Sequence, residues 1–230
     1  ALQAQAGIAA ALAGEAHLAT RRFREAAHLD PATMAMVEGF RYVETHRAGA
    51  RLFGSAAALL DHALSLVPAS GLVLEFGVFR GNSLRQIARR VAPRAAHGFD
   101  SFEGLPEDWS REQPKGSYGL GGALPEVEAN VALHVGWFEA TVPDFARRDG
   151  GSVAFAHIDC DLHSSTRTVF EHLGERMGPG TVLVFDEYLG YPDWRAHEFG
   201  AFQDHVRAAR RRYEYVAFNV FGKQAAVRLI

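Results

Sequence analysis

Four carboxylic acids follow two short apolar runs in this sequence. Asp159 and Asp161 end the first run, and Asp186 and Glu187 end the second. Side chains two positions apart in an extended chain point to the same side. Acids that converge repel one another unless a proton or a cation neutralises them, and Mg²⁺ binds through oxygen ligands. The pattern indicates a divalent metal site. The alternative is that single acids such as Asp161 cap the helices that follow them.

A second group of candidate residues lies in segment 72–84. An apolar run there ends at Glu75, and the chain breaks at Gly77 and Gly81 before a helical pattern begins. Such a turn leaves backbone N–H groups free at a helix N-terminus, and glycine lets that backbone approach a ligand closely. The next apolar run ends at Asp100. In nucleoside-binding folds, an acid ~20 residues after the glycine turn binds the ribose hydroxyls.

The glycine spacing narrows the class of nucleoside. The turn reads G-x-x-x-G, whereas a pyrophosphate needs G-x-G-x-x-G. We therefore expect a nucleoside without a diphosphate, of which S-adenosylmethionine (SAM) is the commonest cofactor. The alternative from another class is an NAD-linked oxidoreductase, which would share the sheet and the ribose-binding acid.

Alternating strand and helix patterns must position these residues. Strands are expected at 72–76, 97–100, 131–135, 153–159, 181–186, 213–220 and 223–230, and helices at 82–92, 164–177 and 196–211. The fold class is α/β: a mostly parallel, seven-stranded Rossmann-like sheet that ends in an antiparallel hairpin around Phe221-Gly222. Because ligands bind at the carboxyl ends of the strands in such sheets, the acids and the glycine turn should meet at one edge.

The segment before the first strand reads as helical. We expect helices over 1–28, from the Asp30-Pro31 start signal onwards, and over 56–67 behind Ser55 as a cap. The chain then divides into an N-terminal helical extension (1–70) and a SAM-binding domain (71–230). Between 101 and 131 the sequence shows little periodicity. A stretch of that length predicts a lid over the substrate, with a tolerated surface insertion as the alternative.

Composition excludes several classes of protein. The 230 residues are 48% apolar and carry a formal net charge of −3, which gives no basic field for a nucleic acid. No run approaches the ~20 apolar residues of a membrane span, and the Ala-rich start lacks the basic region of a signal peptide. The single cysteine, Cys160, fits a reducing compartment. We expect a cytoplasmic protein that binds neither nucleic acid nor membrane. We also expect a homo-oligomer, at least a dimer, with the N-terminal helices as one candidate interface.

Four segments, LEFGVFRG, GFDSFEGLP, HIDCDLHSST and VLVFDEY, together resemble the macrocin-type (TylF/MycF-like) sugar O-methyltransferases. The resemblance covers about residues 34–230 and implies a class I, SAM-dependent methyltransferase fold with a metal ion. It implies that the residues forming the SAM pocket are Glu75, Phe76, Gly77, Arg80, Ser83, Asp100, Ser101, Gly136, Trp137 and Asp159, with Gly136-Trp137 beside the adenine. It implies metal ligands at Asp159, Asp186 and Glu187.

The resemblance also implies a reaction. A methyl group would pass from SAM to a hydroxyl of a small-molecule acceptor, a glycoside or sugar such as a deoxysugar on a natural product. Mg²⁺ would assist, and Asp161 would be the general base. Two positions depart from the family pattern, which commonly has Asp in place of Glu187 and Tyr in place of His163. His163 is therefore a second candidate for the base. A catechol-type O-methyltransferase, with a similar three-acid metal site, is the alternative among methyltransferases.

Overall fold

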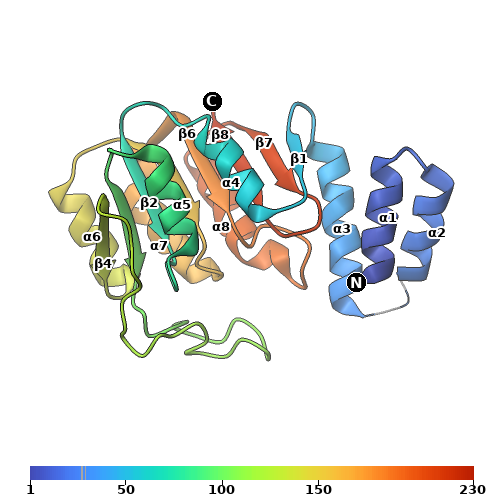
Figure 1. The fold of residues 1–230 in the computed structure, drawn as a ribbon, viewed down its shortest axis with the longest axis horizontal. Coiled ribbons are helices and arrows are strands. Elements are labelled where there is room, and N and C mark those ends of the chain that lie inside the picture. The colour runs from blue at the N-terminus through green and yellow to red at the C-terminus, as the bar shows by residue number, and fades with distance from the viewer. Residues whose placement is uncertain (27, 29) are drawn as a thin grey trace.

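The computed structural model describes residues 1–26, 28 and 30–230 of the chain, and these residues form one eight-stranded sheet with helices packed around it (Figure 1). The strands are β1 (Arg51–Phe53), β2 (Leu72–Phe76), β3 (Ala96–Asp100), β4 (Val131–Val135), β5 (Val153–Ile158), β6 (Met177–Phe185), β7 (Tyr213–Asn219) and β8 (Ala225–Leu229). The α-helices are α1 (Leu2–Leu12), α2 (Ala16–Ala26), α3 (Pro31–His46), α4 (Ala56–Leu64), α5 (Asn82–Val91), α6 (Phe138–Arg148), α7 (His163–Leu173) and α8 (Glu198–Ala208).

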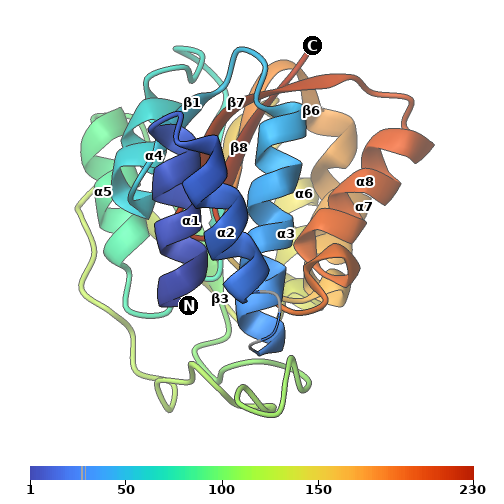
Figure 2. The same ribbon diagram turned by 90° about the vertical axis from the view of Figure 1, so that its right-hand side faces the viewer.

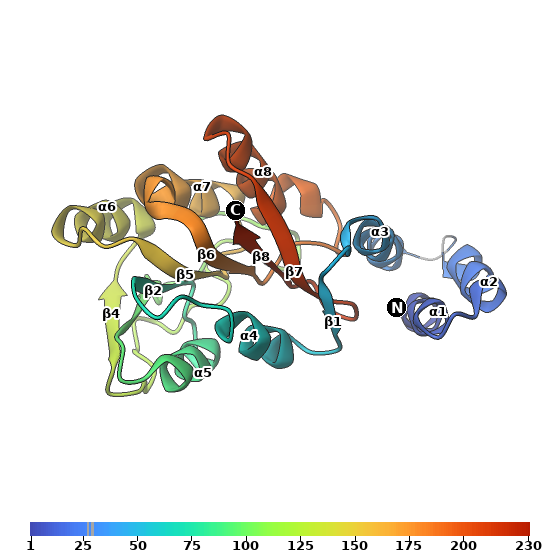
Figure 3. The same ribbon diagram turned by 90° about the horizontal axis from the view of Figure 1, so that it is seen from above.

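The strand order is β1-β7-β8-β6-β5-β2-β3-β4. β8 is antiparallel to its neighbours β6 and β7, and the other described pairs are parallel, which confirms the predicted α/β sheet with an antiparallel hairpin. Helices α4 and α5 cover one face, while α6, α7 and α8 cover the other (Figure 3). The chain continues from β2 to β3 and β4 on one side, whereas β5 pairs with the opposite side of β2. Ligands bind at such a switch point, at the carboxyl ends of the strands.

The sequence pattern misses two elements, so the sheet has eight strands instead of the expected seven, and it misplaces the ends of several others. β1 is only three residues long and its first residue is exposed, so no apolar run reveals it. Helix α6 contains Pro143, which breaks the expected helical pattern. The predicted helix over 164–177 ends at Leu173, and β6 begins at Met177 rather than at 181. Two glycines and a proline, residues 178–180, hide the first part of this strand.

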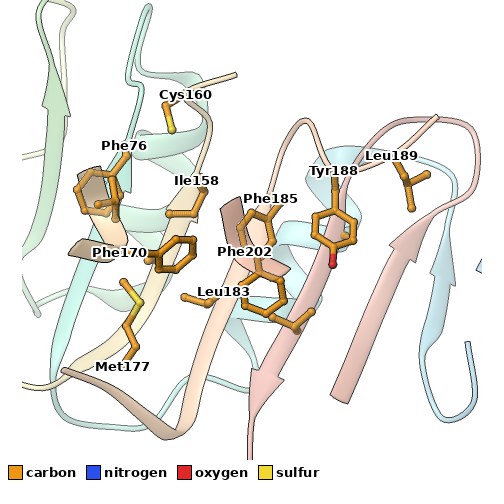
Figure 4. Packing of buried hydrophobic residues seen from close by; sticks show 14 of the residues in the cluster. Phe76, Ile158, Cys160, Phe170, Met177, Leu183, Phe185, Tyr188, Leu189 and Phe202 are labelled. Atoms are coloured by element: carbon orange, nitrogen blue, oxygen red, sulfur yellow. The ribbon is translucent and has the colours of Figure 1, made fainter. Parts of the chain in front are cut away.

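An apolar core between the sheet and α7 and α8 fixes the strand ends. Phe76, Ile158 and Phe185 are the last residues of β2, β5 and β6, and all three are fully buried. Phe170 of α7 and Phe202 of α8 belong to the same cluster (Figure 4). Burying a side chain of this size stabilises the fold by ~1.5–3 kcal/mol. The residues that follow Ile158 and Phe185 therefore leave the sheet at fixed positions.

Helix α3 attaches the N-terminal helices to the edge of the sheet that carries β1 and β7. The Asp30 carboxylate accepts the Thr33 N–H at 2.9 Å, and Pro31 is the first helical residue, so the predicted start signal is confirmed. The hydroxyl of Tyr42 lies 2.6 Å from that of Tyr215 on β7. Helices α1 and α2 pack against α3, face the viewer in Figure 2, and lie outside the layers of the sheet in Figure 3.

Part of the predicted extension belongs to the sheet. β1 pairs with β7, and α4 packs against β6, β7 and β8, although both lie before residue 70. The helix expected over 1–28 is interrupted at residues 13–15, and Ala27 and Leu29 lie outside the described residues. The division at residue 70, the homo-oligomer and the cytoplasmic location stay predictions. Among the helices of the described residues, none combines the length and apolar character that crossing a bilayer requires.

The loop over residues 101–130 joins β3 to β4 and contains neither helix nor strand, as expected (Figure 1). It is held to the rest of the protein at its outer part. The Ser164 hydroxyl donates to Glu107 Oε1 at 2.5 Å, and the Trp109 ring lies 5.5 Å from that of Tyr191. These contacts place the loop over the carboxyl ends of the strands.

Gly39 allows α3 to approach the segment after β6. A Cβ atom at this position would lie 2.7 Å from the Cα atom of Gly190, a backbone atom that cannot move aside as a side chain can. We expect Gly39→Ala to lower the free energy of unfolding by about 1–3 kcal/mol in urea titrations, despite the better helix propensity of alanine.

Gly150→Ala is the matched control, because its added Cβ meets nothing within 4 Å. It should change the free energy of unfolding by less than about 1 kcal/mol. A Gly39→Ala protein as stable as the wild type would show that α3 does not pack this closely.

Candidate functional site

A cavity of about 250 Å³ lies at the carboxyl ends of β2 to β6. Residues after each of these strands line it, together with part of the 101–130 loop. The lining residues are Gly77, Phe79, Asp100, Ser101, Gly104, Leu105, Pro106, Tyr118, Gly136, Trp137, Phe138, Glu139, Asp159, Cys160, Asp161, Ser165, Asp186 and Glu187. The cavity therefore brings together the glycine turn and the four acids that the sequence pattern places at one edge.

The glycine turn forms one wall of the cavity. Gly77 has a φ of +91°, and a Cβ there would lie 1.7 Å from a backbone carbonyl oxygen of the loop after β5, so no other residue fits. Asp100 Oδ2 accepts the N–H groups of Val78 and Phe79 at 2.8 and 2.7 Å. Its Oδ1 accepts the N–H of Phe102 at 2.7 Å. Two N–H groups of the turn are thus engaged by Asp100 rather than free for a ligand, and Asp100 holds the turn in shape.

His157, Asp159 and Asp186 form a compact group beside the turn. One ligand atom from each lies within 4.8 Å of the others. His157 and Glu75 are neighbours on β5 and β2, and Nδ1 lies 2.8 Å from Glu75 Oε1 with both side chains buried. Burial lowers the pKa of His157, but the hydrogen bond and charge of Glu75 and the two aspartates outweigh this effect and raise it to about 9. Burial, followed by the charge of Asp186, raises the pKa of Asp159 well above its usual range.

Glu187 makes an ion pair instead of joining this group. Its Oε2 lies 2.7 Å from the ammonium nitrogen of Lys223, in the turn between β7 and β8. That ammonium lies 5.2 and 5.1 Å from the ring centres of Trp109 and Tyr191. Burial raises the pKa of Glu187 to about 8, and Lys223 opposes the shift. The sequence predicts Asp159, Asp186 and Glu187 as metal ligands. Among the described residues, the compact group contains His157 in place of Glu187.

Asp161 lies in a strained loop at the same edge. It is buried, and burial raises its pKa to about 7 against the opposing charge of Lys223. Its φ is +61°, and Phe79, Phe102 and Tyr118 around the cavity also have positive values of 46°, 57° and 66°. Residues held in this region persist only where the surrounding structure forces them, and they cluster at functional sites.

The structure does not bring every predicted site residue to the cavity. Five predicted residues are absent from its lining: Glu75, Phe76, Arg80, Ser83 and His163. Glu75 and Phe76 are buried within β2, and Arg80 is exposed with its guanidinium 5.1 Å from the Phe79 ring centre. His163 Nε2 lies 3.5 Å from Asp204 Oδ2 on α8, outside the lining of the cavity.

Three polar residues that sequence reasoning misses contact the acids or their loops. Gln224 Nε2 donates to Asp186 Oδ1 at 3.1 Å, and its neighbour Lys223 pairs with Glu187. Glu198 is fully buried at the start of α8 and accepts backbone N–H groups from the loops after β5 and β6. The sequence features that could have pointed to these residues are weak. They are a lysine in a tight hairpin turn and an acid between aromatic residues at a helix start.

Comparison with known proteins gives one family and one curated relative. Residues 74–188, half of the chain, match the family model described as "Methyltransferase domain". Over 155 residues the chain is 30% identical to 8-demethyl-8-(2,3-dimethoxy-alpha-L-rhamnosyl)-tetracenomycin-C 4'-O-methyltransferase from Streptomyces olivaceus. The match covers 56% of this chain and 58% of that protein, so it spans less than two thirds of the relative's length.

Solved structures with a similar fold include two O-methyltransferases. The likeness to the O-methyltransferase NovP has a TM-score of 0.57 at 19% identity and covers 75% of this chain and 78% of that one. The likeness to CalS11, a calicheamicin methyltransferase, has a TM-score of 0.60 at 20% identity and covers 90% and 96%. The predicted Rossmann-like class I fold and the resemblance to sugar O-methyltransferases are confirmed.

The raised pKa values predict that stability depends on pH. A group whose pKa is higher in the folded than in the unfolded state stabilises the fold below its unfolded pKa, and this contribution is lost as pH rises through the folded pKa. For His157 the window runs from ~6.5 to about 9. We expect the free energy of unfolding in urea to fall by roughly 1–3 kcal/mol across that window.

Glu75→Gln is the matched variant, because it keeps the shape of the side chain and removes the charge that holds the proton on His157. It should be less stable than the wild type at pH ~6.5 and lose less stability by pH ~9. Wild-type stability that rises across this window would contradict the assigned proton.

Proposed function

The chain belongs to the methyltransferase-domain family that its residues 74–188 match, and on this premise we propose that it is a SAM-dependent O-methyltransferase. The acceptor in this proposal is a hydroxyl of a sugar, a deoxysugar on a natural product. The tetracenomycin relative, which is named for methylating a rhamnosyl group, supports this class. The observation that carries the proposal is the placement of Asp161 in the same cavity as the glycine turn after β2.

The end of the cavity at the glycine turn suits a nucleoside. Gly77 lines this end of the cavity, and its missing side chain lets β2 and the loop after β5 pack directly against each other there. Gly136, with a φ of +138°, brings the rings of Trp137 and Phe138 to the wall, where they would border the adenine. SAM would supply a methyl group on a sulfonium, which is an excellent leaving group. The protein then has to align donor and acceptor and to remove one proton.

Asp161 is the base in this proposal. Its carboxyl is buried in the cavity, and a pKa of about 7 places it near the operating pH, where a general base is most effective. Lys223 keeps that pKa from rising further. Proton removal by a positioned carboxylate is worth ~10²–10⁴-fold in rate.

We further infer a divalent cation, Mg²⁺, held by Asp159 and Asp186. Carboxylate oxygens are its preferred ligands, and His157 supplies the third ligand atom of the group. Glu75 binds the other imidazole nitrogen, as the outer partner of a metal-binding histidine does. When bound, the cation would stabilise negative charge on the acceptor oxygen and orient a neighbouring hydroxyl. It would compete for His157 with the proton that this side chain carries.

Calorimetry with SAM, in the presence of Mg²⁺ or EDTA, followed by mass spectrometry with glycosylated natural products, tests this function. We expect SAM to bind with micromolar affinity in either buffer, and a product that is heavier by one methylene unit. Turnover should fall at least tenfold in EDTA if the cation assists the reaction. Absence of SAM binding would refute the whole proposal. Full turnover in EDTA would refute only the role of the cation.

Asp161→Asn tests the base. The amide keeps the shape but cannot accept the proton, so turnover should fall at least tenfold while the Kd for SAM stays within about twofold. In the wild type, kcat/KM should fall tenfold per pH unit below about pH 7, because the free carboxylate is the active form.

His163→Asn is the matched control, because this side chain faces Asp204 rather than the cavity. It should leave turnover and the acid limb of the pH profile within about twofold of the wild type. Unchanged turnover in Asp161→Asn, or a large loss in His163→Asn, would reassign the base.

A further inference from the structure

The carboxylate of Glu198 connects two loops that are distant in the sequence. It is the first residue of α8, and its side chain is fully buried. Oε1 accepts the N–H groups of Cys160 and Asp161 at 3.2 and 3.1 Å. Oε2 accepts the N–H of Glu187 at 3.0 Å. One buried side chain thereby holds the loop after β5 against the loop after β6.

These two loops carry the proposed base, Asp161, and both of the proposed cation-binding aspartates, Asp159 and Asp186. Backbone hydrogen bonds between β5 and β6 hold the two loops together only at the strand ends. The last of these bonds runs from the Asp186 N–H to the carbonyl oxygen of Ile158, at 2.9 Å. Asp161 lies beyond that bond, with a φ of +61° that the surrounding structure must enforce. A buried N–H group left without an acceptor is costly, so the three hydrogen bonds that Glu198 accepts are suited to enforce it.

We propose that Glu198 is a positioning residue for methyl transfer, which sets where Asp161 stands relative to the acids after β6. The inference rests on the proposed function, because it concerns the alignment of the base with the acceptor hydroxyl. A misplacement of ~1 Å near reacting atoms can lower a rate by ~10²-fold. Glu198 thus controls turnover although it is absent from the lining of the cavity.

Glu198→Gln is the direct test. The amide has the same shape but one acceptor oxygen in place of two, so one of the loops loses its partner. We expect kcat to fall about 10- to 100-fold. The Kd for SAM from calorimetry, and the KM for the acceptor, should stay within about threefold, because Glu198 does not line the cavity.

Thr181→Val is the matched control for a lost buried hydrogen bond. The Thr181 hydroxyl donates to the carbonyl oxygen of Val153 at 2.7 Å, at the opposite end of β5 and β6. This variant should lower the urea midpoint while leaving kcat within about twofold of the wild type. Comparison of the two variants distinguishes a loss of kcat caused by lower stability from one caused by a displaced Asp161.

Amide hydrogen exchange followed by NMR gives a readout that needs no activity. In the wild type, the amides of Asp161 and Glu187 should exchange slowly, although both residues follow the ends of their strands. In Glu198→Gln at least one of the two should exchange ten or more times faster. If that variant is too unstable to assay, the wild-type exchange alone decides whether the carboxylate protects both loops.

Four results would overturn the inference: unprotected amides in the wild type, an unchanged kcat in Glu198→Gln, a SAM Kd that rises in step with the loss of kcat, or an equal loss of kcat in Thr181→Val. Failure of the proposed function has a different signature. The wild-type protein would then not bind SAM. The results for the variants do not affect that measurement, so the two failures can be told apart.

Discussion

Backbone N–H groups beyond the carboxyl ends of the strands have no neighbouring strand to accept them, and in this protein carboxylate side chains do so. Asp100 accepts three N–H groups around the glycine turn, and Glu198 accepts three from the loops after β5 and β6. Each carboxylate offers up to four acceptor sites, so a single side chain can hold several turns at once. The cavity lies between these two carboxylates, and its shape depends on both.

Carboxylates gathered around the cavity concentrate negative charge there. Two cationic side chains from other elements partly neutralise this charge. His157 reaches the acids from within β5, and Lys223 reaches Glu187 from the hairpin turn between β7 and β8. Removing a charged group from water is expensive unless a partner compensates for it. The pKa values of Asp161 and Glu187 are therefore raised by burial, yet only to about 7 and 8 because Lys223 lies close to both. The result is a pair of carboxyls that can exchange protons near neutral pH.

The sequence predicts much of the fold because its parallel strands are short apolar runs with turn residues between them. β2, β4, β5 and β7 begin where the pattern places them, and the strand ends that carry Asp159 and Asp186 follow directly. The pattern fails where local sequence and tertiary role disagree. β1 is too short and exposed to carry a signal, and β6 begins in a segment rich in glycine. Helix α6 contains a proline, which sequence rules place outside helices.

The part of the site that follows directly from the strand ends is also predictable from the sequence. Acids that end adjacent strands must converge, so Asp159, Asp161 and Asp186 could be placed in one cavity from their spacing alone. Partners that arrive from other elements leave no such trace. The pairing of Glu187 with Lys223 depends on the register of the hairpin, and that of His157 with Glu75 on β2 lying beside β5. No periodicity encodes either contact.

The hairpin turn between β7 and β8 also links the acids of the cavity to the completion of the sheet. Lys223 and Gln224 meet Glu187 and Asp186 there, across long separations in the sequence. Contacts between segments far apart in the sequence cost loop-closure entropy and slow folding. Until the hairpin docks, the acids at the ends of β5 and β6 lack this lysine, and their mutual repulsion opposes the closing of the strands. Completion of the pocket by Lys223 and Gln224 is therefore coupled to completion of the sheet by β7 and β8.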